Sequence, residues 1–154
     1  MSPFRILLPL WILLWIVTGI ATWPWHTMQL YSAPWSWIVA ALFFLAGISV
    51  YRRIRTNPGA HIFLGSAELR PQDHEQKLVT TGMYAHVRHP IYLAHFCTLL
   101  ACTVGSGLLV NYCLLASAVL TGTAMIAMEE RELEKRFGEE FCEYRKSTSG
   151  IIPH

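Results

Sequence analysis

The sequence predicts an all-α polytopic membrane protein with about four transmembrane helices and a C-terminal amphipathic helix at the membrane interface. Of the 154 residues, 53% are hydrophobic and only 14% are charged, whereas soluble domains average roughly 25% charged residues. The charges are also segregated, because residues 6–25, 27–51 and 96–128 contain no Asp, Glu, Lys, Arg or His. One helical crossing of a bilayer needs about 20 apolar residues, so each stretch is long enough to span it.

The first two charge-free stretches predict single spans, over residues 6–23 and 35–51. The third is too long for one untilted crossing, and Gly105-Ser106-Gly107 interrupts it with a flexible turn that can close a helical hairpin. It therefore predicts two spans, over residues 90–104 and 108–128. The whole chain is expected to form one domain, with a two-helix scaffold (1–51), a cytosolic loop (52–89), the hairpin (90–128) and a cytosolic tail (129–154).

The basic residues predict the orientation of these spans. Arg5 precedes the first span, six basic residues lie in the loop between the second and third, and the other five follow the fourth. The positive-inside rule then places both termini in the cytosol of a multi-pass protein. The expected location is a prokaryotic plasma membrane, or the endoplasmic reticulum of a eukaryote. Gly19-Ile20-Ala21 loosely resembles a signal-peptide cleavage site, but the apolar run is long and ends in Trp23-Pro24-Trp25, so we expect an uncleaved span.

An amphipathic helix is expected after the fourth span. Leu133, Phe137, Phe141 and Tyr144 follow one another at intervals of four, four and three residues, which is one stripe of a helix. Charged residues occupy the other faces. The helix is therefore expected to begin directly from the end of the span and to lie at the cytosolic interface.

Polar residues are densest just before the third span. Pro90 suits the first position of a helix, and the 15 residues up to Gly105 would make a span too short for the bilayer, about 22 Å at 1.5 Å per residue. A recessed helix start would bring Arg88, His89 and the positive helix terminus to a partly buried pocket that favours a carboxylate or phosphate. Alternatively, both side chains reach to lipid head groups, or His86, His89 and His95 bind a metal; of the metal we expect none.

A resemblance to a known family rests on several motifs together. Residues 77–92 contain Arg88-His89-Pro90-Ile91-Tyr92, and the hydrophobic hairpin is followed by Glu129-Glu130, by residues 137–141 (FGEEF) and by a terminal Ile152-Pro153. This arrangement resembles the isoprenylcysteine carboxyl methyltransferase family, whose wider group includes phospholipid N-methyltransferases. The similarity covers about residues 76–153.

The resemblance implies an S-adenosylmethionine-dependent methyltransferase without a Rossmann domain, acting on a lipidic or small hydrophobic acceptor. The lipid bilayer is its expected surroundings, no obligate protein partner is inferred, and the small net charge of +2 gives no reason to expect nucleic acid. The implied catalytic residues are Arg88, His89 and Glu129. The implied cofactor-binding residues are Gln76, Lys77, Leu78, Val79, Tyr84, His89, Pro90, Ile91, Tyr92, Glu129 and Glu130.

One position departs from the family pattern. Prenylcysteine methyltransferases carry a substrate-associated arginine one helical turn before the first glutamate, and that position here is Met125. Without this cation an amine or a thiol is as plausible an acceptor as a carboxylate. Two other readings stay open, a non-catalytic membrane scaffold or binding protein and a membrane reductase of the same architecture. Glu129 and Glu130 could also be ordinary solvated residues neutralised by their helix neighbours.

Overall fold

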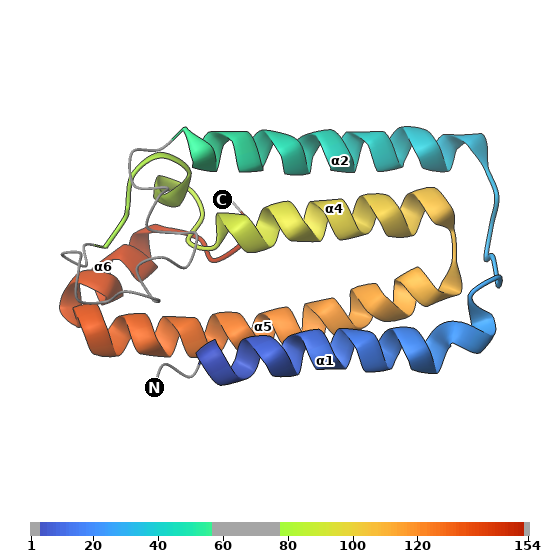
Figure 1. Cartoon of the computed structure of the whole chain (residues 1–154). Coiled ribbons are helices and arrows are strands. Elements are labelled where there is room, and N and C mark those ends of the chain that lie inside the picture. Colours follow the sequence, from blue (N-terminus) through green and yellow to red (C-terminus); the bar gives the residue numbers. More distant parts are fainter. Residues whose placement is uncertain (1–3, 57–77, 153–154) are drawn as a thin grey trace. The chain divides into compact units, whose positions relative to one another are not determined.

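The computed structural model describes residues 4–56 and 78–152, and the regular structure in this part of the chain is helical (Figure 1). The predicted all-α class is confirmed. The α-helices are α1 (Phe4–Thr22), α2 (Pro34–Arg55), α4 (Pro90–Ser106), α5 (Leu109–Phe137) and α6 (Glu139–Ser147), with the 3-10 turns η1 (Trp23–Trp25) and η3 (Gly82–Ala85).

Two of these helices are long and apolar enough to cross a membrane. They are α2, with a mean hydropathy of 1.6, and α5, with 1.7. The third predicted span corresponds to α4, which is apolar but only 17 residues long, and which begins at Pro90 as expected. The first predicted span corresponds to α1, whose apolar part is also shorter than the 18 residues that a crossing helix needs here. Four crossings therefore remain a prediction.

The chain divides into two compact units. The first unit comprises Met1–Gly47 and His95–Ala127, and the second comprises Ile48–Ala94 and Met128–His154.

A closed turn between α4 and α5 organises one end of the first unit. Gly107 has a φ of 63°, a left-handed conformation that suits glycine, and a Cβ atom there would lie 2.4 Å from the Tyr31 carbonyl oxygen. The Leu30 amide donates to the Gly107 carbonyl at 2.8 Å, and the Leu109 amide donates to the Met28 carbonyl at 3.0 Å. The Tyr31 hydroxyl donates to the Val104 carbonyl at 2.9 Å. The turn predicted at Gly105-Ser106-Gly107 is confirmed, and it is held by the segment that precedes α2.

Small residues mediate helix contacts in the first unit. A Cβ atom on Gly105 of α4 would lie 3.1 Å from the Cβ of Ala40 on α2. The Thr18 hydroxyl of α1 lies 3.5 Å from the Ser117 hydroxyl of α5. Large apolar side chains such as Ile20 and Trp37 are instead exposed. Close backbone approach through small residues, with large side chains outward, is typical of helices that pack in lipid.

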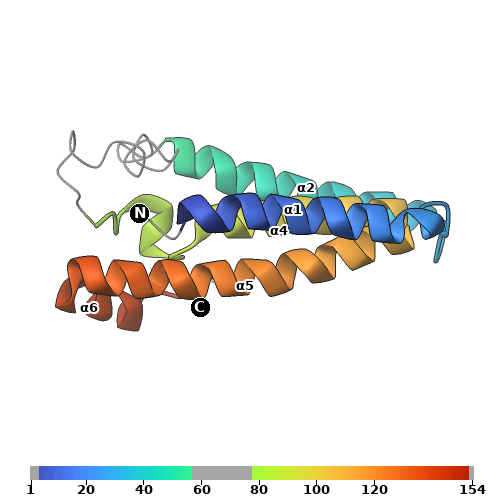
Figure 2. The same cartoon turned by 60° about the horizontal axis from the view of Figure 1, so that its bottom comes forward.

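The predicted amphipathic helix is divided in the second unit, which corrects the sequence-based boundary. The helix of the fourth predicted span continues as α5 to Phe137. Gly138 then breaks it with φ 57° and ψ −123°, and α6 folds back beside the last turns of α5 (Figures 1 and 2). An apolar residue occurs at position 141 because α6 buries Phe141 completely within the protein. The apolar spacing of α5 therefore continues in the sequence although the helix has ended. Phe141 is a core residue, so the stripe does not form one continuous helical face.

Candidate functional site

The predicted site residues that the structure describes all lie in the second unit. Gln76 and Lys77 lie outside the described residues. Leu78 and Val79 are half-buried ahead of η3, Tyr84 is buried within η3, and Pro90, Ile91 and Tyr92 form the first turn of α4. Glu129 and Glu130 lie on α5, near its C-terminal end.

The Glu130 carboxylate is the centre of a charged cluster. Its Oε1 atom accepts hydrogen bonds from Arg88 Nε at 3.0 Å and from Arg88 Nη2 at 2.8 Å. The same oxygen lies 3.1 Å from His89 Nε2. The solvated-helix reading of Glu130 is therefore wrong, because its carboxylate is paired with residues that precede α4. The side chain of Arg88 is only 12% exposed.

The two ring nitrogens of His89 lie near different glutamates, Nδ1 near Glu129 and Nε2 near Glu130. Its Nδ1 atom is 3.7 Å from Glu129 Oε2, and its ring meets the Tyr92 ring edge-on, with centroids 5.8 Å apart. Burial lowers the pKa of His89 below its usual 6.5, outweighing the opposite effect of the Glu130 hydrogen bond. A neutral imidazole that donates from Nε2 to Glu130 carries its lone pair on Nδ1, on the side of Glu129.

Two tyrosines complete the cluster in uncharged form. Burial raises the pKa of Tyr84, and the nearby charge of Glu129 raises it further. Burial also raises the pKa of Tyr144 to about 12. The Tyr144 hydroxyl donates to the Tyr84 backbone carbonyl at 2.6 Å, which ties α6 to η3. Both phenols therefore act as neutral polar groups at physiological pH.

A C-terminal segment that sequence reasoning missed borders this cluster. The Arg88 amide donates to the Ser149 carbonyl at 2.8 Å, and the His89 amide donates to the Gly150 carbonyl at 3.0 Å. Thr148 and Ser149 are buried. The sequence gives no signal for these hydrogen bonds, because they join backbone atoms about 60 residues apart.

The cluster contains more anionic and accepting groups than free donors. Glu129 is partly exposed, at 38%, and the lone pair of neutral His89 faces it. Arg88 is occupied by Glu130 and by backbone carbonyls. The arrangement therefore suits a ligand that presents hydroxyl, amine or cationic groups more than a free anion.

Comparison with known proteins assigns the chain to a family. The model of the phospholipid methyltransferase family matches residues 34–140, which is more than half of the chain. The chain belongs to the phospholipid methyltransferase family. The family assignment made from the sequence motifs is thereby confirmed.

A relative is found in Schizosaccharomyces pombe (strain 972 / ATCC 24843), where a protein-S-isoprenylcysteine O-methyltransferase is 39% identical over 89 residues. The aligned region covers 56% of this chain and 36% of the yeast protein, so the chain spans about a third of the length of this relative. No solved structure gives a significant match.

Proposed function

We propose that the protein is a membrane-embedded methyltransferase that transfers a methyl group from S-adenosylmethionine to a lipidic or small hydrophobic acceptor at the cytosolic interface. The observation that carries the proposal is the cluster of His89, Glu129 and Glu130 beside the first turn of α4 in a member of the phospholipid methyltransferase family. The topology expected from the basic residues, with four spans and both termini in the cytosol, belongs to this proposal.

The chemistry of the cluster fits this cofactor. S-adenosylmethionine presents an ammonium group, a sulfonium group and ribose hydroxyls, all of which pair well with carboxylates or a neutral imidazole. Glu129 and the lone pair of His89 supply such acceptors on one side of the cluster. Tyr84 and the first turn of α4, from Pro90 to Tyr92, are the remaining described residues that would hold it.

The chain's own contribution to the reaction is orientation. S-adenosylmethionine supplies the methyl group on a positively charged sulfur, so the protein must hold the acceptor atom in line with it and exclude water. Neutral His89 would add no positive charge to a site that holds a sulfonium, and the pairing of Arg88 with Glu130 offsets the guanidinium charge. His89 is held between Glu129 and Glu130, which restricts the orientation of its ring.

The nature of the acceptor atom follows from the available cations. A buried acceptor carboxylate needs a positively charged partner, since an unpaired charge costs several kcal/mol. Met125 stands at the position where prenylcysteine methyltransferases carry an arginine, and Arg88 already donates to Glu130 and to two backbone carbonyls. Among the described residues 4–56 and 78–152, Arg88 is thus already occupied, and for this part of the chain an amine or thiol acceptor fits better than a carboxylate.

Binding of S-adenosylmethionine to detergent-purified protein tests the proposal. We expect His89→Ala and Glu129→Ala each to weaken binding roughly ten- to a hundred-fold, because each removes a charge-assisted hydrogen bond of about 1.5–3 kcal/mol. His86→Ala and Glu132→Ala are matched controls. His86 is exposed, and Glu132 pairs with Arg136 on α5 at 3.1 Å.

Isothermal calorimetry would measure the affinities, and thermal unfolding would verify that each variant is folded. Equal affinity in the site variants and the controls would contradict the assigned site. Binding of a nicotinamide cofactor in place of S-adenosylmethionine would favour the reductase reading, and binding of neither would favour the scaffold.

A further inference from the structure

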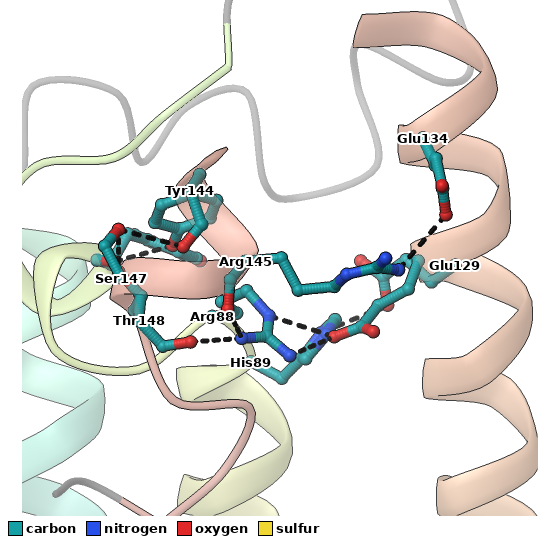
Figure 3. A network of polar contacts seen from close by, with 10 residues as sticks. Arg88, His89, Glu129, Glu134, Tyr144, Arg145, Ser147 and Thr148 are labelled. Carbon is teal, nitrogen blue, oxygen red and sulfur yellow. Dashed lines mark hydrogen bonds and ion pairs between the residues drawn. The ribbon is translucent and has the colours of Figure 1, made fainter. Parts of the chain in front are cut away.

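One guanidinium group connects three separate chain segments in the second unit. Arg88, just before α4, contacts Glu130 on α5 through Nε and Nη2. Its Nη1 atom donates to the Arg145 carbonyl of α6 at 3.1 Å and also to the Thr148 carbonyl. Figure 3 shows the Arg88 side chain reaching from the backbone beside His89 toward the end of α6.

These contacts use most of the donors that an arginine has. The guanidinium carries five N–H groups in a planar fork, and four hydrogen bonds from Arg88 end on protein oxygens. The side chain is also largely buried, at 12% exposed. Arg88 is therefore built into the protein and is poorly placed to receive an anionic ligand.

The contacts of Arg88 with the end of α6 provide hydrogen-bond donors for backbone carbonyls that have no partner within the helix. The last four carbonyls of an α-helix lack intrahelical partners, and the helix dipole makes that end negative. Arg145 lies in the last turn of α6 and Thr148 follows its end. Arg88 therefore caps α6 from another part of the chain with a positive charge.

The backbone next to Arg88 binds the segment that follows α6. Val87 and Ser149 form an isolated parallel bridge, and the amides of Arg88 and His89 donate to the carbonyls of Ser149 and Gly150. Val87 is completely buried. The residues that carry the predicted chemistry and the residues that dock the C-terminal segment are thus neighbours in the sequence.

We propose that Arg88 is a positioning residue that docks the C-terminal segment 148–150 and, through the same guanidinium, holds Glu130 against His89. Docking of the segment and orientation of the imidazole are thereby coupled. We call the contacts of the Arg88 guanidinium with Glu130 and with the carbonyls of Arg145 and Thr148 the Arg88 clasp. The Nδ1 atom of His89 is held beside Glu129 only while this clasp is formed. The inference rests on the proposed function for the identity of the ligand, but the clasp itself is a property of the free protein.

Lysine cannot reproduce this arrangement. An ammonium group is a single point of charge, whereas the guanidinium fork reaches a carboxylate and two carbonyls at once. Arg88→Lys keeps the charge and loses the fork, and Arg88→Met removes both. Arg136→Met is the matched control, because Arg136 forms an exposed pair with Glu132 within α5.

Two measurements on the ligand-free protein test the clasp. We expect hydrogen exchange at the amides of residues 88 and 89 to accelerate at least about tenfold in Arg88→Met and by an intermediate factor in Arg88→Lys. The ¹⁵N shifts of the His89 ring should change from one dominant tautomer, with the proton on Nε2, to a mixture in Arg88→Met. Arg136→Met should match the wild type in both measurements.

Binding of S-adenosylmethionine to the same variants tests the coupling. We expect Arg88→Met to bind at least about tenfold more weakly than the wild type, with Arg88→Lys between them. Faster exchange with an unchanged His89 tautomer and unchanged affinity would overturn the coupling, and unchanged exchange would overturn the clasp. If the folded wild type binds no S-adenosylmethionine, the proposed function fails, while exchange and tautomer still decide the clasp.

Discussion

The two units of the molecule are stabilised by different kinds of contact. In the first unit, large apolar side chains point outward. The buried residues described there are all small, namely Ser36, Ala40, Gly47, Ala101, Thr103, Gly105 and Gly107. In the second unit, the buried residues include Tyr84, His89 and Phe141. Every ion pair found among the described residues also belongs to the second unit.

This difference follows from the solvent that each unit is suited to. Helices in lipid gain nothing from burying leucine, so they associate through small residues, hydroxyl groups and tight turns. The second unit buries aromatic side chains and pairs its charges, as a domain in water does. A binding site for a polar cofactor is therefore expected in the second unit, where charged groups can be held in place.

Two of the three glycines with positive φ, Gly107 in the first unit and Gly138 in the second, give the largest expected difference between the units. At Gly107 of the first unit, an added Cβ would meet the Tyr31 carbonyl at 2.4 Å, so Gly107→Ala combines backbone strain with a clash and should cost about 2–5 kcal/mol. At Gly138 of the second unit, the Cβ would meet nothing within 4 Å. Gly138 combines φ 57° with ψ −123°, a conformation that side chains other than glycine rarely adopt, so Gly138→Ala should cost this backbone strain alone, about 1–3 kcal/mol.

Reversible unfolding of the detergent-solubilised protein would measure both costs. Gly122→Ala is the control, because a Cβ at this position in α5 also meets nothing within 4 Å and no unusual φ is present. It should be neutral or stabilising. Equal destabilisation by Gly107→Ala and Gly138→Ala would mean that the turn of the first unit adjusts around residue 107 without an additional cost.

The first unit was the easier one to predict from the sequence. The turn at Gly105-Ser106-Gly107 follows from local chemistry, since glycine suits a turn. In the second unit, the start of α4 at Pro90 follows in the same way, since proline suits the first helical position. Both are confirmed by the structure. Charge-free runs mark the helices of this unit almost directly.

The second unit was harder to predict because its structure depends on distant contacts. The break at Gly138 was missed, although a glycine after a run of helix formers is a known stop signal, because the apolar spacing continued through it to Phe141. The sequence motif brought His89 and Glu129 into one site. It could not show that Arg88 is occupied by the carbonyls of Arg145 and Thr148, since backbone oxygens carry no sequence signal.

The pH dependence of stability should be larger in the second unit, because it contains buried His89. Its folded-state pKa lies below the ordinary value of 6.5 owing to burial. Between the two values the unfolded chain binds the proton and the folded chain does not. Stability should therefore be complete above about pH 6.5 and should fall as the pH decreases below that value.

Unfolding measured between pH 7.5 and 5.5, an interval of roughly two units around the ordinary histidine pKa, isolates this effect from the carboxylates. His89→Gln removes the titrating group and should flatten the profile over that interval. A His86→Gln variant, altered at an exposed position, should keep the wild-type slope. A wild-type profile that instead rises toward pH 5.5 would mean that the glutamates outweigh burial and hold His89 in its charged form.

The smallest expected difference concerns two tyrosine hydroxyls that bond to backbone carbonyls, one in each unit. Tyr31 donates to the Val104 carbonyl at 2.9 Å and lies 2.7 Å from the Tyr112 hydroxyl, whereas Tyr144 donates to the Tyr84 carbonyl at 2.6 Å. Tyr31→Phe should cost about 0.6 kcal/mol, because partners in a membrane are easily replaced in the unfolded reference state. Tyr144→Phe should cost about 1 kcal/mol or more, because it leaves the carbonyl of the buried residue Tyr84 without this donor. Unfolding free energies of both variants would measure the difference, with Tyr51→Phe as an exposed control on α2. A larger loss for Tyr31→Phe would show that the hydroxyl pair with Tyr112, and not the surrounding solvent, sets the strength of these bonds.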